Sequence, residues 1–139
     1  MNARSPNNQE TQDREPTILV IEQDDETRPL LKYNLCKQGY RPIVVLDEEG
    51  GIERVWGRNK HPDLILLNQV NLSVEEFINM GRRIREQAGF PTSTPIVVIA
   101  ERFGADMEGK DVQVGENEYV TYPEDARQLI NLLHRLCPT

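Results

Sequence analysis

The sequence has only two cysteines, few aromatic residues and no long apolar run. Its 139 residues include Cys36, Cys137 and 6% aromatic residues, and no apolar stretch approaches the roughly 18 residues of a membrane-spanning helix. The cysteines are interpreted as reduced thiols, because disulfide frameworks belong to small, cysteine-dense secreted domains. Neither cysteine lies at metal-ligand spacing from a histidine, and His61 and His134 stand alone, so no zinc site is expected.

Basic residues are also scarce, at 16 Lys and Arg against 23 Asp and Glu, which gives a net charge of −7. A surface of this sign repels phosphate backbones and anionic lipids, so neither a nucleic-acid partner nor membrane docking is expected. The N-terminus has no apolar segment of the signal-peptide type, and a cytoplasmic location is expected.

Residues 1–15 differ from the rest of the chain. They are polar and show no period, which predicts a disordered tail. Residues 16–139 are numerous enough for one domain with a hydrophobic core.

Within 16–139, short apolar runs alternate with helical patterns. Strands are expected over 17–22, 41–46, 63–68, 94–100 and 119–122, and helices within 26–40, 48–60, 73–87 and 123–137. Ser73, with Glu76 three residues later, forms a capping box that predicts the start of the third helix. Alternation of strands that are apolar along their whole length predicts an α/β doubly wound parallel sheet with helices on both faces.

One segment fits this alternation poorly. A helix is required between 102 and 118, yet Gly104, Gly109 and Gly115 fall there and "DVQV" has the period of a strand. A helix in this segment is therefore expected to be short or irregular.

Four segments, "ILVIEQDD", "PDLILLN", "PIVVIA" and "YVTYP", occur in an order and spacing that resemble the receiver domain of bacterial response regulators. The resemblance covers residues 17–137. It implies a flavodoxin-like, five-stranded parallel sheet of strand order 2-1-3-4-5. It also implies a non-enzymatic module of a two-component or phosphorelay signalling system.

In that family an aspartate at the end of the third strand accepts a phosphoryl group from a histidine kinase. Two acidic residues bind Mg²⁺, and a hydroxyl and a lysine complete the site. The matching positions here are Asn68 for the acceptor, Glu22 and Gln23 for the acidic pair, Ala100 for the hydroxyl and Tyr122 for the lysine. An amide is a poor nucleophile, and a single carboxylate offers Mg²⁺ little, so Mg²⁺ binding is predicted to be weak or absent.

The pattern resembles a pseudo-receiver, which binds a protein partner without being phosphorylated. Gln23 and Asn68 can hydrogen-bond each other or Glu22 and so close the pocket without a metal ion. A register shifted by two residues would make Asp24 and Asp25 the metal ligands. That register lengthens the first strand past Gln23, so both aspartates are interpreted as loop and helix-cap residues.

Two alternatives remain open. The domain could be an orthodox receiver with unusual acceptor chemistry, for example with Asn68 deamidated to aspartate. It could also be a flavodoxin-like small-molecule-binding domain, although no glycine-rich phosphate loop follows the first strand.

The resemblance also carries expectations for the C-terminal third of the chain. Tyr119 matches the aromatic switch residue of the family, or is simply a tyrosine beside the core. The Tyr122–Pro123 peptide bond is expected to be cis, as at the corresponding position of the family. The last helix is expected to bury Ala126, Leu129, Ile130, Leu133, Leu136 and Cys137. Leu132 is expected to be exposed, and a partner or homodimer contact is expected to use residues 103–135.

Overall fold

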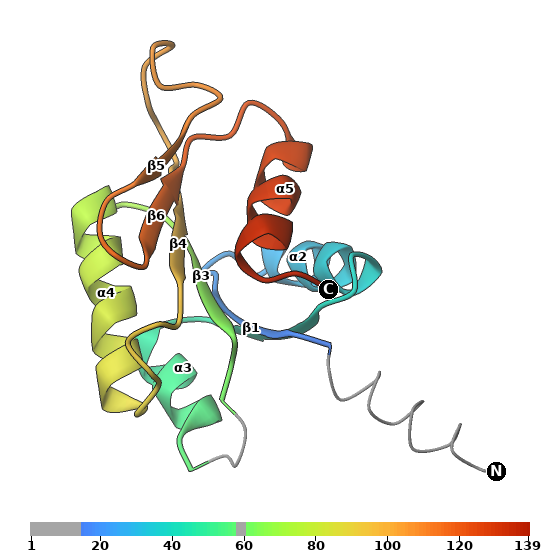
Figure 1. Ribbon diagram of the computed structural model, residues 1–139, viewed down its shortest axis with the longest axis vertical. Coiled ribbons are helices and arrows are strands. Elements are labelled where there is room, and N and C mark those ends of the chain that lie inside the picture. Colours follow the sequence, from blue (N-terminus) through green and yellow to red (C-terminus); the bar gives the residue numbers. More distant parts are fainter. Residues whose placement is uncertain (1–14, 58–60) are drawn as a thin grey trace, which may run out of the picture.

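The computed structural model describes residues 15–57 and 61–139, so the predicted disordered tail lies outside the described residues except for Glu15. Its elements form one sheet with helices on both faces (Figure 1). The strands are β1 (Thr17–Ile21), β2 (Arg41–Val45), β3 (Leu64–Asn68), β4 (Ile96–Ile99), β5 (Asp111–Gln113) and β6 (Glu118–Thr121). The helices are α2 (Thr27–Lys37), α3 (Glu48–Val55), α4 (Val74–Gln87) and α5 (Ala126–Leu136).

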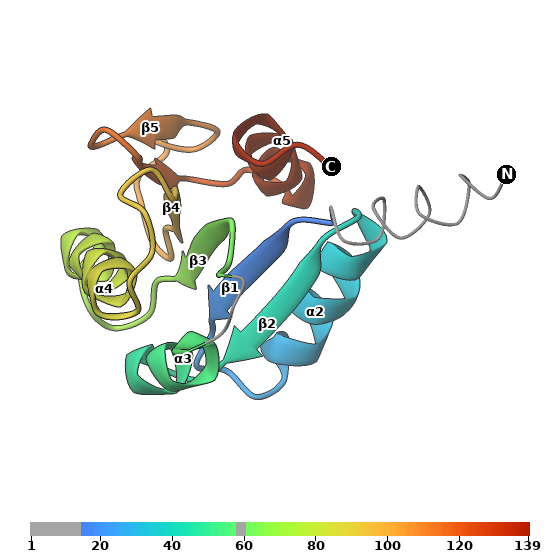
Figure 2. The ribbon, with the colours of Figure 1, turned by 60° about the horizontal axis from the view of Figure 1, so that its bottom comes forward.

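The strand order is β2-β1-β3-β4-β6-β5, and every neighbouring pair is parallel except β5 with β6. Helices α2 and α5 lie on one face, and α3 and α4 lie on the other (Figure 2). With β6 as the fifth parallel strand, the parallel strands follow the predicted order 2-1-3-4-5. This order confirms the flavodoxin-like α/β architecture. Strand β5 is an additional antiparallel strand at one edge.

The central strands are buried on both faces, which explains why their sequences are apolar without alternation. Leu19 and Ile21 of β1 belong to the core cluster under α3 and α4, whereas Ile18 and Val20 belong to the cluster under α2 and α5. Helix α4 approaches the sheet closely, since a Cβ at Gly81 would lie 2.7 Å from Cγ2 of Ile96.

Helix α4 begins where the sequence predicts. The Ser73 hydroxyl accepts a hydrogen bond from the Glu76 backbone N–H at 3.0 Å, and the Glu76 carboxylate accepts one from the Ser73 N–H at 3.2 Å. The capping box is therefore confirmed, and it fixes the chain where it enters the helix.

The expected helix between 102 and 118 is wrong. This segment, all of it described, holds turns and the hairpin of β5 and β6 instead. Gly109, at φ +88°, adopts the left-handed backbone needed to enter the hairpin. The three glycines destabilise a helix in this segment, whereas the alternating "DVQV" can pair with β6. The segment therefore forms a strand instead of a helix.

The predicted exposure of Leu132 is also wrong. Leu132 is 1% exposed and belongs to the core cluster under α2 and α5, whereas Ala126 is exposed. The buried stripe of α5 runs through Leu129, Leu132, Leu133, Leu136 and Cys137, which repeats the i, i+3, i+4, i+7 pattern from a different start. The helix therefore turns a different side to the sheet than predicted, because burying Leu132 removes more apolar surface from water than burying Ala126 would.

Candidate functional site

The residues that match the phosphorylation pocket meet at the carboxyl edge of the sheet. Glu22 follows β1, Asn68 ends β3, Ala100 follows β4 and Tyr122 follows β6. Because these strands are parallel neighbours, their last residues come together at one edge.

Asn68 and Glu22 are joined directly. The Asn68 Nδ2 donates a hydrogen bond of 2.6 Å to Glu22 Oε1, and the backbone N–H of Asp24 donates to Glu22 Oε2 at 3.1 Å. Glu22 is only 3% exposed, and both of its carboxylate oxygens have a donor. The amide end of Asn68 must face the carboxylate, since its carbonyl oxygen would repel it. The predicted hydrogen bond from the Asn68 amide to Glu22 is therefore present.

Gln23 does not take part in this closure. Its side chain is exposed, and no hydrogen-bond partner for its amide lies among the described residues. Only its backbone is engaged, because Arg28 Nη1 donates to the carbonyl oxygens of Glu22 at 3.0 Å and of Gln23 at 3.1 Å. Arg28 also pairs with the Asp25 carboxylate, so a cation of the chain itself lies in this acidic loop.

Asp24 caps the turn that leads into α2. Its carboxylate accepts hydrogen bonds from the Thr27 hydroxyl at 2.6 Å and the Thr27 backbone N–H at 2.8 Å. The hydrogen bond from the hydroxyl, followed by that from the backbone, lowers the pKa of Asp24 below its ordinary value. The interpretation of Asp24 as a cap rather than a metal ligand agrees with this geometry.

An aromatic pair forms where β6 ends. The Tyr122 ring meets the Phe103 ring edge to face, with centroids 5.4 Å apart and planes at 82°. Both rings pack against the core cluster that contains Ala100, which is 4% exposed. Phe103 could not be recognised from its sequence position, because its approach to Tyr122 depends on the path of the loop before β5.

The predicted cis bond before Pro123 is wrong. The described residues contain no cis peptide bond, so Tyr122–Pro123 is trans. The backbone of Tyr122 is held in the hairpin, where its N–H donates to the Lys110 carbonyl at 2.8 Å and its carbonyl accepts from Gly109 at 2.7 Å. The intrinsically favoured trans isomer satisfies these bonds.

Tyr119 lies on the opposite face of the sheet from Ala100. It packs against the cluster under α2 and α5, whereas Ala100 belongs to the cluster under α3 and α4. The role of Tyr119 as a switch stays a prediction, and its ring in this structure does not face the Ala100 side.

Gln69 is a further residue of the site that the sequence did not single out. Its Oε1 accepts from the Glu101 backbone N–H at 2.8 Å, and its Nε2 donates to the Leu72 carbonyl at 2.9 Å. The side chain thus ties the loop after β3 to the loop after β4. These loops border a polar depression of about 310 Å³ beside the site.

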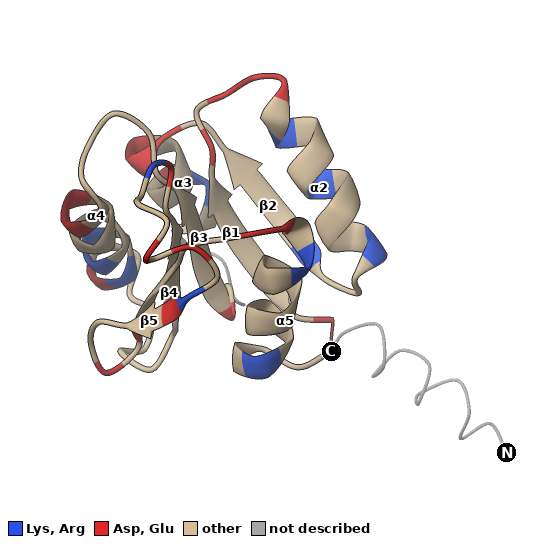
Figure 3. Ribbon diagram, turned by 90° about the horizontal axis from the view of Figure 1, so that it is seen from above, with Lys and Arg blue, Asp and Glu red and all other residues tan. Residues whose placement is uncertain are grey.

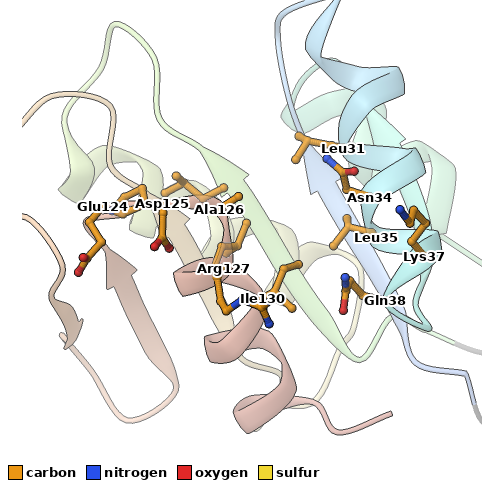
Figure 4. Close-up of a pocket in the computed structure, with 13 residues that line it drawn as sticks. Leu31, Asn34, Leu35, Lys37, Gln38, Glu124, Asp125, Ala126, Arg127 and Ile130 are labelled. Carbon is orange, nitrogen blue, oxygen red and sulfur yellow. The ribbon is translucent and has the colours of Figure 1, made fainter.

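A larger cavity of about 600 Å³ lies between α2 and α5 (Figure 4). Leu31 and Leu35 line it from α2, and Ala126, Arg127 and Ile130 line it from α5. The helices are joined at their far ends, where the Tyr40 hydroxyl donates to the Cys137 carbonyl at 2.8 Å and the Tyr40 ring stacks on His134.

The donor set does not suit Mg²⁺. Among residues 15–57 and 61–139, no group of three or more His, Cys, Asp or Glu could hold a metal ion. The one carboxylate of the matched site, Glu22, already has donors on both oxygens, and Asn68 presents its N–H₂ group toward it. Mg²⁺ prefers several hard oxygen ligands, and the matched positions supply a single carboxylate whose oxygens already accept hydrogen bonds.

None of the described helices combines the length and apolar character needed to cross a membrane.

Comparison with known proteins supports the same family. No protein-family model matches the chain. The chain is 30% identical over 114 residues to the transcriptional regulatory protein AfsQ1 of Streptomyces coelicolor, covering 82% of this chain and 48% of that protein. It is 29% identical over 106 residues to the transcriptional regulatory protein YxdJ of Bacillus subtilis, covering 76% and 43%.

Solved receiver structures share the fold. The receiver domain of the sensor histidine kinase PA1611 from Pseudomonas aeruginosa, which has a magnesium ion in its active-site cleft, superposes with a TM-score of 0.60 at 22% identity. That match covers 89% of this chain and 98% of the other. The chemotaxis protein CheY4 of Vibrio cholerae gives a TM-score of 0.60 at 18% identity, covering 87% and 98%.

The chain spans about half the length of the curated relatives that it matches. The curated relatives are similar to it in sequence over that half, and the solved receiver structures are similar to it in fold. In both fold and sequence the chain is therefore similar to the receiver domains of response regulators.

Proposed function

We propose that this receiver domain acts through contact with a protein partner and is not phosphorylated. The observation that carries the proposal is the 2.6 Å hydrogen bond from Asn68 to Glu22 at the position of the phosphoryl acceptor. The amide nitrogen is neutral and its electron pair is delocalised, so it is a poor nucleophile. The domain is accordingly proposed to be a binding module rather than an enzyme.

The charges around the site support the proposal. A receiver of the usual type gathers several carboxylates that repel each other without a metal ion. Here Glu22 is the only carboxylate at the matched positions. The Asn68 amide donates a hydrogen bond to it, so the carboxylate has a partner without a metal ion. At the position of the lysine, Tyr122 packs against Phe103, so this position supplies no cation to a phosphoryl oxygen. The site is thus complete without Mg²⁺ or phosphate.

An NMR titration tests this function. Amide resonances of the chain would be followed while Mg²⁺ and then beryllofluoride, a phosphoryl mimic, are added. We expect no localised shifts at Glu22, Asn68 or Ala100. The PA1611 receiver domain, whose structure contains magnesium, serves as the positive control for the reagents. Saturable shifts at those three residues of this chain at low-millimolar Mg²⁺ would refute the proposal.

Deamidation of Asn68 is the remaining route to a phosphorylatable site. It would convert the amide donor to a carboxylate beside Glu22 and thereby break the hydrogen bond between them. Intact-mass measurement of protein purified from its native source distinguishes the asparagine form from the aspartate form, since deamidation adds about one dalton. We expect the unmodified mass. The proposal concerns this domain alone, because the relatives named as transcriptional regulators are about twice as long.

A further inference from the structure

The sheet has two open edges, formed by β2 and β5, and they differ in what they offer. In β2, the Arg41 N–H donates to Pro16 and the Val45 carbonyl accepts from Glu22, so these residues turn their backbone toward β1. By alternation, Pro42 and Val44 turn theirs outward. Since Pro42 has no N–H, the outer edge of β2 keeps only the Val44 donor and is a poorer template for another strand.

Strand β5 offers a complete edge. The Tyr122 N–H donates to Lys110 at 2.8 Å and the Val114 N–H donates to Glu118 at 2.9 Å, so residues 110, 112 and 114 face β6. Asp111 and Gln113 therefore direct two N–H and two carbonyl groups away from the sheet. In the described part of the chain these four groups have no hydrogen-bond partner. Figure 2 shows β5 as the outermost strand on its side.

The edge is held in the strand conformation from both sides. Gln128 of α5 donates to the Asp111 carboxylate at 2.9 Å, and the Thr121 hydroxyl donates to the same oxygen at 2.7 Å. On the other face, Glu118 pairs with Arg82 and Arg85 of α4 at 3.0 and 2.9 Å. A template fixed in advance loses little conformational entropy when a second strand adds to it.

The charge around this edge selects the partner. Residues 101–125 contain eight acidic and two basic residues, a net charge of −6 in a chain of net charge −7. Figure 3 shows acidic residues along the hairpin and the loop before it. Two copies of such an edge repel each other, whereas a basic segment is attracted. Val114, 47% exposed beside the strand, adds an apolar contact.

We propose that the outer edge of β5 binds an extended, basic segment of a partner protein as an added antiparallel or parallel strand. Asp111 and Gln113 supply the main-chain hydrogen bonds, and the surrounding carboxylates supply the charge attraction. The inference rests on the proposed function only in that it names the kind of partner. A domain that failed the beryllofluoride test could still bind through this edge, so the two are tested separately.

The test uses the full chain and a synthetic peptide of about nine residues with alternating lysine and valine. Binding is followed by NMR shifts and by amide hydrogen exchange. We expect shifts centred on Asp111 and Gln113 and slower exchange of these two amides. A peptide of the same sequence with alternate nitrogens methylated keeps its charge but loses one pairing edge. It is expected to bind about tenfold more weakly, as the loss of main-chain hydrogen bonds requires.

Two variants at one position provide the matched control. Gln113→Pro removes an outward N–H without touching the ladder to β6, and is expected to weaken the peptide about tenfold. Gln113→Ala removes the side chain but keeps the N–H, and should bind within about twofold of the wild type. Glu116→Lys should also weaken binding, while Glu53→Lys on α3 changes the net charge equally and should have little effect.

Three outcomes would overturn the inference. Equal binding of the methylated peptide would show attraction by charge alone. Shifts centred on the cavity between α2 and α5 would place the site elsewhere. Shifts at Asp111 and Gln113 that depend on protein concentration without peptide would make a second copy of the chain the occupant.

Discussion

At the scale of single residues, the amide of Asn68 gives the Glu22 carboxylate a structural role. Glu22 is buried and accepts two hydrogen bonds, so it serves as a structural acceptor that links β1 and β3. A buried carboxylate is tolerated only when its oxygens have donors. The hydrogen bond from Asn68 therefore stabilises the junction between β1 and β3.

The variant Asn68→Asp should destabilise the domain at neutral pH. It replaces a donor by a second carboxyl group within hydrogen-bond distance of Glu22, which leads to repulsion and a loss of roughly 1–3 kcal/mol in the free energy of unfolding. Protonation of one of the two carboxyl groups relieves this repulsion. The destabilisation should therefore be weaker at low pH and stronger at neutral pH.

Urea unfolding near pH 5 and pH 7.5 measures this effect. The deficit of Asn68→Asp relative to the wild type should be larger at the higher pH. Asn68→Ala removes the hydrogen bond without adding a charge, so its deficit should be similar at both values. A variant with aspartate as stable as the wild type at pH 7.5 would contradict the structural role given to this bond.

At the scale of the elements, the buried side of α5 is determined by its leucines. Leu132 and Leu133 are both in the core, between α2 and the sheet. Leu132→Ala should lower the free energy of unfolding by about 2–5 kcal/mol, the range for removing a buried leucine side chain. Leu30→Ala on α2, where the leucine is 62% exposed, should change it by less than about 0.5 kcal/mol. Chemical denaturation compares the two, and similar values would mean that α5 is turned differently.

The hairpin is fastened to α4 by a buried acid. Burial alone would raise the pKa of Glu118, but hydrogen bonds and charge from Arg82 and Arg85 outweigh it and hold the pKa below its ordinary value. Glu118→Gln leaves Arg85, which also donates to the Thr94 carbonyl, without its carboxylate. We expect a loss of roughly 1–3 kcal/mol in stability and faster amide exchange in β5 and β6.

The lowered pKa of Glu118 also sets a direction with pH. A carboxyl group with a lowered pKa stabilises the fold above its unfolded value, and this contribution is lost as the pH falls through the folded pKa. The difference in stability between the wild type and Glu118→Gln should therefore shrink on acidification below about pH 4.5. Thermal unfolding across this range checks the trend, and a constant difference would remove Glu118 from the account of acid stability.

At the scale of the whole molecule, the architecture follows from the order of apolar runs and helical patterns. The ends of the parallel strands also bring Glu22 and Asn68 together, as their alignment predicts. What the sequence could not predict depends on contacts between distant segments. Gln128 and Arg82, which lie far away in the sequence, hold the hairpin of β5 and β6 in place, and the contact of Phe103 with Tyr122 depends on the path of the loop before β5. The sequence pattern of α5 allows a buried face with either Ala126 or Leu132, and packing against α2 and the sheet determines that Leu132 is buried.

The proline in β2 has a consequence for the stoichiometry of any complex. A sheet with two competent edges can add strands at both ends and grow into an open polymer. Here Pro42 removes a donor from one edge, so strand addition is favoured at β5. Once β5 is occupied, the described part of the chain offers no second edge with a full set of donors. Pairing through the sheet is therefore terminated at a closed one-to-one assembly.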